Sequence, residues 1–225
     1  MDLDAFLAEL AEWAETRDPG FETLAYGSHA DQVVDVRRGG DRNAVVVHGG
    51  FWRPAFTRTN TQALAVDLAL RGWTTWNIEY RRTGLHDTLA DVEAALDLTG
   101  PGVAIGHSAG GHLVLWAGGT GKIERAVSLA GVTDLARAAR EGIGANAAVE
   151  FAGADPPTHA DPMRRLPLRV PALLAHGTED DRVPVDYSRA FARAAGAELL
   201  ELPGAGHFEV IDPRTPEWAR IVAHL

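Results

Sequence analysis

The sequence contains no cysteine, which excludes disulfide bonds, thiolate nucleophiles and cysteine-ligated zinc. Lysine is almost absent too, because Lys122 is the only lysine among 21 basic residues. Acidic residues outnumber basic ones, and the net charge is −10 at pH 7. An acidic surface repels phosphate groups, so neither nucleic acid nor an anionic membrane is an expected partner.

Long apolar runs are also absent, and none reaches the length that spans a membrane. The acidic opening Met1-Asp2-Leu3-Asp4 is not followed by the apolar core of a signal peptide, so we expect a cytoplasmic protein. With 225 residues, 46% of them hydrophobic, the chain is expected to form one domain over residues 1–225 with a large buried core. The composition does not predict the oligomeric state.

What the sequence does contain is an alternation of strand-like and helix-like segments. Continuous β-branched runs predict buried strands, and apolar residues three and four apart predict helices. The expected strands are 31–38, 44–47, 73–78, 102–105, 125–130, 170–175 and 197–202. The expected helices are 2–17, 58–71, 87–98, 108–117, 186–195 and 218–225. This order is typical of an α/β fold with a mainly parallel sheet and helices on both faces, and segment 31–38 alternates like an edge strand.

Two segments stand apart from this alternation. Residues 1–20 hold an amphipathic N-terminal helix, which we expect to pack on its own domain rather than on a partner. Residues 131–169 are irregular and rich in proline. An insertion of this length in a compact domain is usually functional, so we expect a short lid or a pocket wall there.

The stretch Gly106-His107-Ser108-Ala109-Gly110 lies between a predicted strand and a predicted helix. In that setting G-x-S-x-G is typical of a nucleophile elbow, a sharp turn that lifts the serine hydroxyl clear of the backbone. Glycine is needed on both sides because the strand and the helix approach closely. The helix also directs free N–H groups and its positive dipole end at this position. The alternative is that Ser108 only caps the helix.

A serine hydroxyl needs an imidazole to take its proton and a carboxylate to orient that imidazole. Hydrolases of this fold class carry these residues in the order serine, acid, histidine. Ser108 and His207 fit this order, and each follows a predicted strand, where ligands of parallel sheets bind. Several acids are candidates at this stage: Glu179, Asp180, Asp181 and, more distantly, Asp134.

The tetrahedral intermediate of such a reaction needs fixed N–H donors for its oxyanion. The N–H of Ala109 is one, and the loop His48-Gly49-Gly50-Phe51 is placed to supply others. We expect His48 to brace this loop by hydrogen bonds rather than to act as a base. Trp52 is expected to line the substrate pocket, and the alternative is that it anchors the loop in the core. No metal-ligand pattern is present, so neither a metal site nor a cofactor is expected.

These motifs resemble those of the α/β-hydrolase superfamily, and they look closest to arylformamidase (kynurenine formamidase)-like and small carboxylesterase-like enzymes. The segments that carry the resemblance are His48–Trp52, Gly106–Leu113, His176–Pro184 and Gly206–Phe208. The resemblance implies an α/β-hydrolase fold. It also implies Asp180 as the acid, since Asp180–Pro184 matches an Asp-x-x-Val-Pro pattern. The N–H groups of Gly50, Phe51 and Ala109 are the oxyanion donors that it implies.

The sequence therefore predicts a serine hydrolase that cleaves a small carboxylic ester or an aryl formamide through an acyl-enzyme intermediate. Ser108 attacks, His207 transfers the proton and Asp180 orients His207. Trp52 is the predicted substrate contact. Two alternatives stay open: a non-catalytic ligand-binding member of the same fold, and an acyltransferase that uses an alcohol or amine in place of water.

Overall fold

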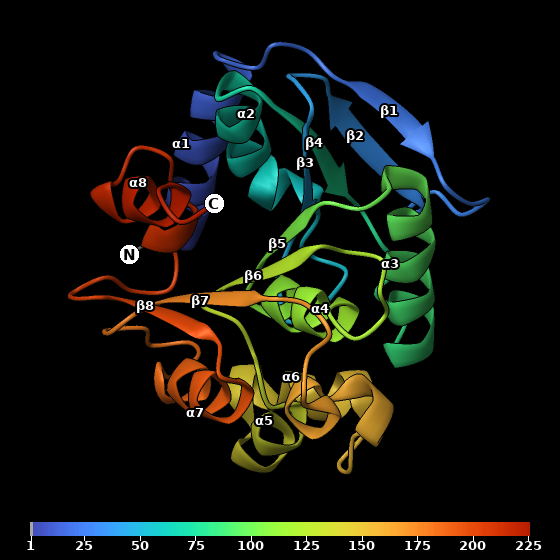
Figure 1. Ribbon diagram of the computed structural model, residues 1–225, viewed down its shortest axis with the longest axis vertical. Helices are drawn as coiled ribbons and strands as arrows, with labels where there is room; N and C mark the ends of the chain where they lie inside the picture. The colour runs from blue at the N-terminus through green and yellow to red at the C-terminus, as the bar shows by residue number, and fades with distance from the viewer. Residues whose placement is uncertain (1) are drawn as a thin grey trace.

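The computed structural model describes residues 2–225, so Met1, at the start of the predicted ranges 1–20 and 1–225, lies outside the described residues. One sheet of eight strands forms the centre, in the order β1-β2-β4-β3-β5-β6-β7-β8 (Figure 1). The strands are β1 (Glu22–Ala25), β2 (Val33–Arg37), β3 (Arg42–Val47), β4 (Trp73–Ile78), β5 (Val103–His107), β6 (Arg125–Leu129), β7 (Ala172–Gly177) and β8 (Glu198–Leu202). From β4 to β8 neighbouring strands are parallel, whereas β1–β2 and β2–β4 are antiparallel pairs.

Helices cover both faces of this sheet, as the sequence predicts (Figure 1). They are α1 (Leu3–Glu15), α2 (Gln62–Leu70), α3 (Leu85–Thr99), α4 (Ala109–Ala117), α5 (Leu135–Glu141), α6 (Ile143–Ala152), α7 (Asp186–Ala195) and α8 (Pro216–Val222). Short 3-10 turns are η1 (Arg58–Thr61), η2 (Thr158–Ala160), η3 (Pro162–Arg165) and η4 (Glu209–Ile211). Among residues 2–225, no helix combines the length and the apolar character needed to cross a membrane.

The central strands are buried on both faces, which explains their continuous apolar runs. In β3, Val45 and Val47 face a core cluster that includes residues of α3, α4, α5, α6 and α7. Ala44 and Val46 face the opposite cluster, to which α2 and α8 contribute. Because successive side chains of a strand alternate between faces, both sets must be apolar.

The edge of the sheet differs from the sequence prediction. Segment 31–38 was expected to be the edge strand, but β2 pairs with β1 on one side and with β4 on the other. β1 is the outer strand, and only Leu24 among its residues is partly buried. A four-residue strand with almost no buried side chain carries little hydrophobic alternation, so its sequence gave no strand signal.

Segment 131–169 contains α5, α6, η2 and η3 and so has more regular structure than its sequence suggests. Three consecutive residues of α6, Gly144, Ala145 and Asn146, have positive φ and interrupt the helix. α5 and α6 pack on each other below α4 and beside α7 (Figure 1). The register places Val47 of β3 opposite Gly106 of β5, so the carboxyl ends of the central strands meet at one edge.

Candidate active site

Ser108 lies between β5 and α4 in a backbone conformation of φ 54° and ψ −115°, which a residue with a side chain rarely adopts. The two glycines of the motif permit the close approach that this turn requires. A methyl group on Gly106 would lie 2.1 Å from the carbonyl oxygen of Gly110. One on Gly110 would lie 2.1 Å from the carbonyl oxygen of Val47. The local geometry is therefore that of the predicted elbow.

His207 is buried in the loop after β8, and its imidazole is oriented by Asp180. Nδ1–H of His207 donates to Oδ2 of Asp180 at 2.7 Å. The other carboxylate oxygen of Asp180 accepts the N–H groups of Arg182 and Val183, both at 2.8 Å. These bonds leave Nε2 of His207 as the ring nitrogen that can exchange a proton with a substrate.

The other candidate acids lie elsewhere. Glu179 and Asp181 flank Asp180 but are exposed. Asp134 caps α5, where its carboxylate accepts the N–H of Arg137. Of the four candidates, only Asp180 contacts His207 in the described residues.

A second histidine that the sequence analysis did not assign supports the same carboxylate. Nε2 of His176 lies 3.1 Å from Oδ2 of Asp180 and 2.8 Å from the carbonyl oxygen of Val183. Nδ1 of His176 lies 2.7 Å from Oγ of Ser188. Burial would raise the pKa of Asp180, but the hydrogen bonds from His176 and His207 outweigh it and hold that pKa well below its usual range. Asp180 is thus kept ionised against His207.

His107 fixes the backbone that carries His207. Its Nε2–H donates to the carbonyl oxygen of His207 at 2.9 Å, and the two ring centroids are 4.7 Å apart. Burial, followed by repulsion from His207, lowers the pKa of His107 to about 3. A neutral His107 therefore acts as a hydrogen-bond donor to the His207 loop.

Ser108 and His207 line the same cavity, whose volume is about 90 Å³. Gly49, Gly50 and Phe51 form another part of its wall. Within residues 2–225, the backbone N–H groups of Gly50, Phe51 and Ala109 donate to no protein acceptor. Gly50 and Phe51 belong to the cavity wall, and Ala109 directly follows Ser108.

Hydrogen bonds of His48 hold the loop that contains Gly50 and Phe51 in place, as expected from the sequence. Nε2 of His48 lies 2.9 Å from Oε1 of Glu79, and Nδ1 lies 2.7 Å from the carbonyl oxygen of Gly49. Tyr80 stacks on the His48 ring with centroids 4.3 Å apart, and its hydroxyl donates to the His48 carbonyl at 2.8 Å. Both ring nitrogens of His48 therefore lie beside oxygens of Glu79 and of the loop itself.

Glu79 is a buried carboxylate that accepts several hydrogen bonds beside the site, and the sequence analysis gave it no role. Besides His48, it accepts the N–H groups of Arg58 and Tyr80 and pairs with the guanidinium of Arg82. Burial would raise the pKa of Glu79, but these hydrogen bonds and charges lower it to about 2. Tyr80 and Arg82 are sequence neighbours of Glu79, but His48 and Arg58 come from separate segments, so no local pattern predicts this role.

The structure places Trp52 away from the cavity that holds Ser108, in contrast to the predicted substrate contact. Its side chain is 4% exposed and packs between Phe151, at a centroid distance of 4.6 Å, and His112, at 5.3 Å. Trp52 borders a different cavity, whereas Phe51 borders both. The backbone of Phe51 and Trp52 has positive φ and turns sharply, so the side chains of these two neighbours have different surroundings.

Segment 131–169 contacts the loop that contains Gly50, Phe51 and Arg53 through α6. Arg53 pairs with Glu150 at 2.8 Å, and the ring of Phe51 packs so closely on Gly144 that a methyl group there would lie 2.3 Å away. In the part of the chain that the structure describes, no residue of 131–169 lines the Ser108 cavity. Three residues of α6, Ala147, Glu150 and Phe151, instead line the neighbouring cavity that Phe51 and Trp52 border. The wall of the Ser108 cavity includes Leu3 and Leu7 of α1.

No group of three or more His, Cys, Asp or Glu side chains that could hold a metal ion occurs in residues 2–225.

Solved structures with the same architecture include several hydrolases. A proposed thioesterase from Silicibacter sp. TM1040 has a TM-score of 0.79 and 21% identity, over 97% of this chain and 92% of its own. A thermophilic esterase from Thermogutta terrifontis has a TM-score of 0.73 and 21% identity, over 92% and 90%. An acetyl ester-xyloside bifunctional hydrolase from Caldicellulosiruptor lactoaceticus has a TM-score of 0.73 and 18% identity, over 92% and 96%.

The fold that these likenesses define is the α/β-hydrolase fold. Residues 86–215, more than half of the chain, match the prolyl oligopeptidase family, and the chain belongs to that family. No curated protein sequence gave a match.

Proposed function

We propose that the protein is a serine hydrolase that cleaves small carboxylic esters or aryl formamides through an acyl-enzyme intermediate. One observation carries this proposal. Ser108, on its strained turn, and His207, hydrogen-bonded to the buried carboxylate of Asp180, line one small cavity. Nucleophile, base and orienting acid are the groups that acyl transfer to serine requires.

In the proposed first step, Oγ of Ser108 attacks the carbonyl carbon while Nε2 of His207 takes the hydroxyl proton. Asp180 stabilises the resulting imidazolium through its bond to Nδ1. The negative charge on the carbonyl oxygen is stabilised by the free N–H groups of Gly50, Phe51 and Ala109. His48 and Glu79 hold the loop with two of these donors, so little rearrangement is needed during the reaction.

In the proposed second step, His207 donates its proton to the leaving oxygen or nitrogen, and water then releases the acyl group from Ser108. A second cavity, of about 260 Å³, borders His207 but not Ser108, and its wall includes Glu179, Asp181 and Glu209. The leaving group must lie beside the histidine that protonates it. We therefore assign the polar second cavity to the leaving group and the first cavity to the acyl group.

An ester substrate is supported by the solved structures that are named as esterases. An aryl formamide is supported by the aromatic Phe51-Trp52 pair after the two loop glycines, which resembles the formamidase version of the loop. The bond from His207 to the buried carboxylate of Asp180 supports catalysis over simple ligand binding, because it fixes the tautomer that a general base needs.

The test uses p-nitrophenyl esters, N-formylkynurenine and a peptide p-nitroanilide as substrates. Ser108→Ala is expected to lower kcat by about 10⁴-fold or more while the fold is retained, because this residue supplies the nucleophile. Ser28→Ala, at an exposed turn, is the matched control and should retain full activity. A fluorophosphonate is expected to label Ser108, as read by peptide mass spectrometry. Wild-type rates in Ser108→Ala would refute the mechanism.

A further inference from the structure

The apolar stripe of α1 contacts two different parts of the molecule. In its second half, Leu10 and Ala14 are fully buried and form a small cluster with Ala63 and Val66 of α2. In its first half, Leu3 and Leu7 are only partly buried, and both line the cavity that holds Ser108. Leu3 also borders the second cavity, whereas Leu7 borders the Ser108 cavity alone of the two. The second half thus anchors the helix, and the first half extends over the candidate active site.

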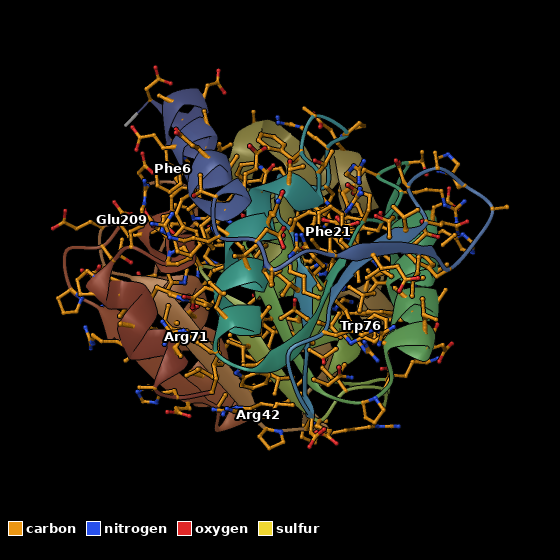
Figure 2. The ribbon with its side chains drawn as sticks, turned by 90° about the horizontal axis from the view of Figure 1, so that it is seen from above. Phe6, Phe21, Arg42, Arg71, Trp76 and Glu209 are labelled. Atoms are coloured by element: carbon orange, nitrogen blue, oxygen red, sulfur yellow. The ribbon has the colours of Figure 1, made fainter. Side chains whose placement is uncertain are left out.

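A further contact fixes the first half next to the candidate base. The rings of Phe6 and Phe208 lie 5.8 Å apart, and Phe208 directly follows His207 in the chain. Figure 2 shows Phe6 and Glu209 on the same side of the molecule. Arg42, the first residue of β3, lies far from both. The start of α1 is therefore placed by the same loop that carries His207.

The cavity that results is small and mostly apolar. Its apolar lining consists of the side chains Leu3, Leu7, Phe51, Phe56, Phe208 and Ile211. The polar side chains of Asn60 and Arg182 also border the cavity. The volume of this cavity, about 90 Å³, leaves room for a small group only. This space fits an acyl chain of a few carbons.

We propose that Leu3 and Leu7 are specificity-determining residues that close the acyl side of the site and select esters of short fatty acids. This inference rests on the proposed function, because it assigns the cavity to the acyl group of a Ser108 ester. Neither leucine touches the reacting atoms. Each acts by limiting how far the acyl chain extends from Ser108 and by contributing apolar surface that excludes water.

The experiment compares kcat/KM for p-nitrophenyl acetate, butyrate, hexanoate and octanoate. In the wild type, kcat/KM is expected to decline beyond butyrate or hexanoate. The double variant Leu3→Ala/Leu7→Ala is expected to raise the octanoate-to-butyrate ratio by about tenfold or more, since a single methylene group changes selectivity by about that factor. Leu7→Trp is expected to change the ratio in the opposite direction and to retain acetate hydrolysis.

Leu98→Ala is the matched control, because this leucine is 41% exposed on α3 and does not line the cavity. It should leave the ratio unchanged. Circular dichroism and the melting temperature check that each variant folds, and Leu7→Trp removes no core side chain. An unchanged ratio in both α1 variants, with hydrolysis still dependent on Ser108, would overturn this inference alone. Hydrolysis that persists in Ser108→Ala would instead overturn the proposed function.

Labelling gives a second readout that does not need turnover. The rates at which ethyl and octyl fluorophosphonates modify Ser108 report how much space lies beside the nucleophile. The double variant is expected to gain relative reactivity toward the octyl reagent, and Leu7→Trp to lose it. Equal reactivity ratios in wild type and both variants would count against a pocket closed by α1.

Discussion

The indole ring of Trp52 stacks on the ring of Phe151 with centroids 4.6 Å apart and planes 5° from parallel. Trp52 belongs to the loop with two of the proposed oxyanion donors, and Phe151 belongs to α6. Arg53 and Glu150 pair beside this stack at 2.8 Å. Segment 131–169 therefore supports the proposed chemistry by holding a loop in place, without itself lining the Ser108 cavity.

Removal of this stack should displace all the oxyanion donors of the loop together. For Trp52→Ala we expect kcat to fall for every substrate alike, by up to about 10²-fold, because a displacement near 1 Å has that effect. Loss of a large buried side chain should also lower the free energy of unfolding by about 3–5 kcal/mol. Kinetics with phenyl acetate and ethyl acetate, together with urea unfolding, test both expectations.

Trp52→Phe is the matched variant, because it keeps an aromatic ring against Phe151, and it should retain most of the activity. Trp52→Ala could instead raise KM for phenyl acetate and leave kcat for ethyl acetate unchanged. That result would support the expectation that Trp52 contacts the substrate.

The buried carboxylate of Glu79 makes a pH-dependent contribution to stability. Its pKa is lowered to about 2 in the folded state, so this contribution is present above the unfolded pKa near 4.5 and is lost as the pH falls toward 2. From the size of the shift it amounts to about 3 kcal/mol. We expect the difference in unfolding free energy between wild type and Glu79→Gln to shrink by about that amount between pH 5 and pH 2.

Urea unfolding at pH 5, 3.5 and 2 measures this difference. Glu22→Gln is the control, because Glu22 is exposed and, within residues 2–225, pairs only with Arg38 at the long distance of 3.7 Å. The free energy of unfolding of Glu22→Gln should equal that of the wild type at each pH. A constant gap between wild type and Glu79→Gln over this range would mean that the Glu79 carboxylate is not stabilised by its partners.

The assignment of the acid predicts an order among three neighbouring substitutions. Asp180→Asn should lower kcat by about 10³–10⁴-fold, because an amide does not fix the tautomer of His207 or stabilise its charged form. Asp181→Asn and Glu179→Gln change exposed side chains and should have far smaller effects. Steady-state kinetics with one ester give the order. If Asp181→Asn had the largest effect, the acid would be Asp181.

The predictions that agree with the structure rest on local patterns. The flanking glycines and the apolar strand identified the turn at Ser108, and a single apolar stripe identified α7 over the whole of 186–195. The two-faced burial of β3 could be read from its continuous β-branched run. These features depend on residues close together in the sequence, so a single sequence contains the necessary information.

The features that the sequence did not reveal depend on contacts between distant segments. Glu79 contacts His48 across 31 positions, and His107 donates to the backbone carbonyl of His207 across 100 positions. The stripe on α1 predicted burial but not the surface that it would cover. An amphipathic pattern shows which side of a helix is apolar and leaves its partner undetermined, so segment 131–169 was assigned the pocket wall that α1 contributes to.

The strained backbone of Ser108 has a consequence for the evolution of this protein. A φ of 54° with ψ of −115° destabilises a residue with a side chain by roughly 1–3 kcal/mol, and only glycine escapes this strain. Ser108→Gly should therefore melt a few degrees above Ser108→Ala, at roughly 2–4 °C per kcal/mol, while both are inert. Selection for thermal stability alone would favour loss of the nucleophile. Persistence of serine at this strained position requires continued selection for its chemistry.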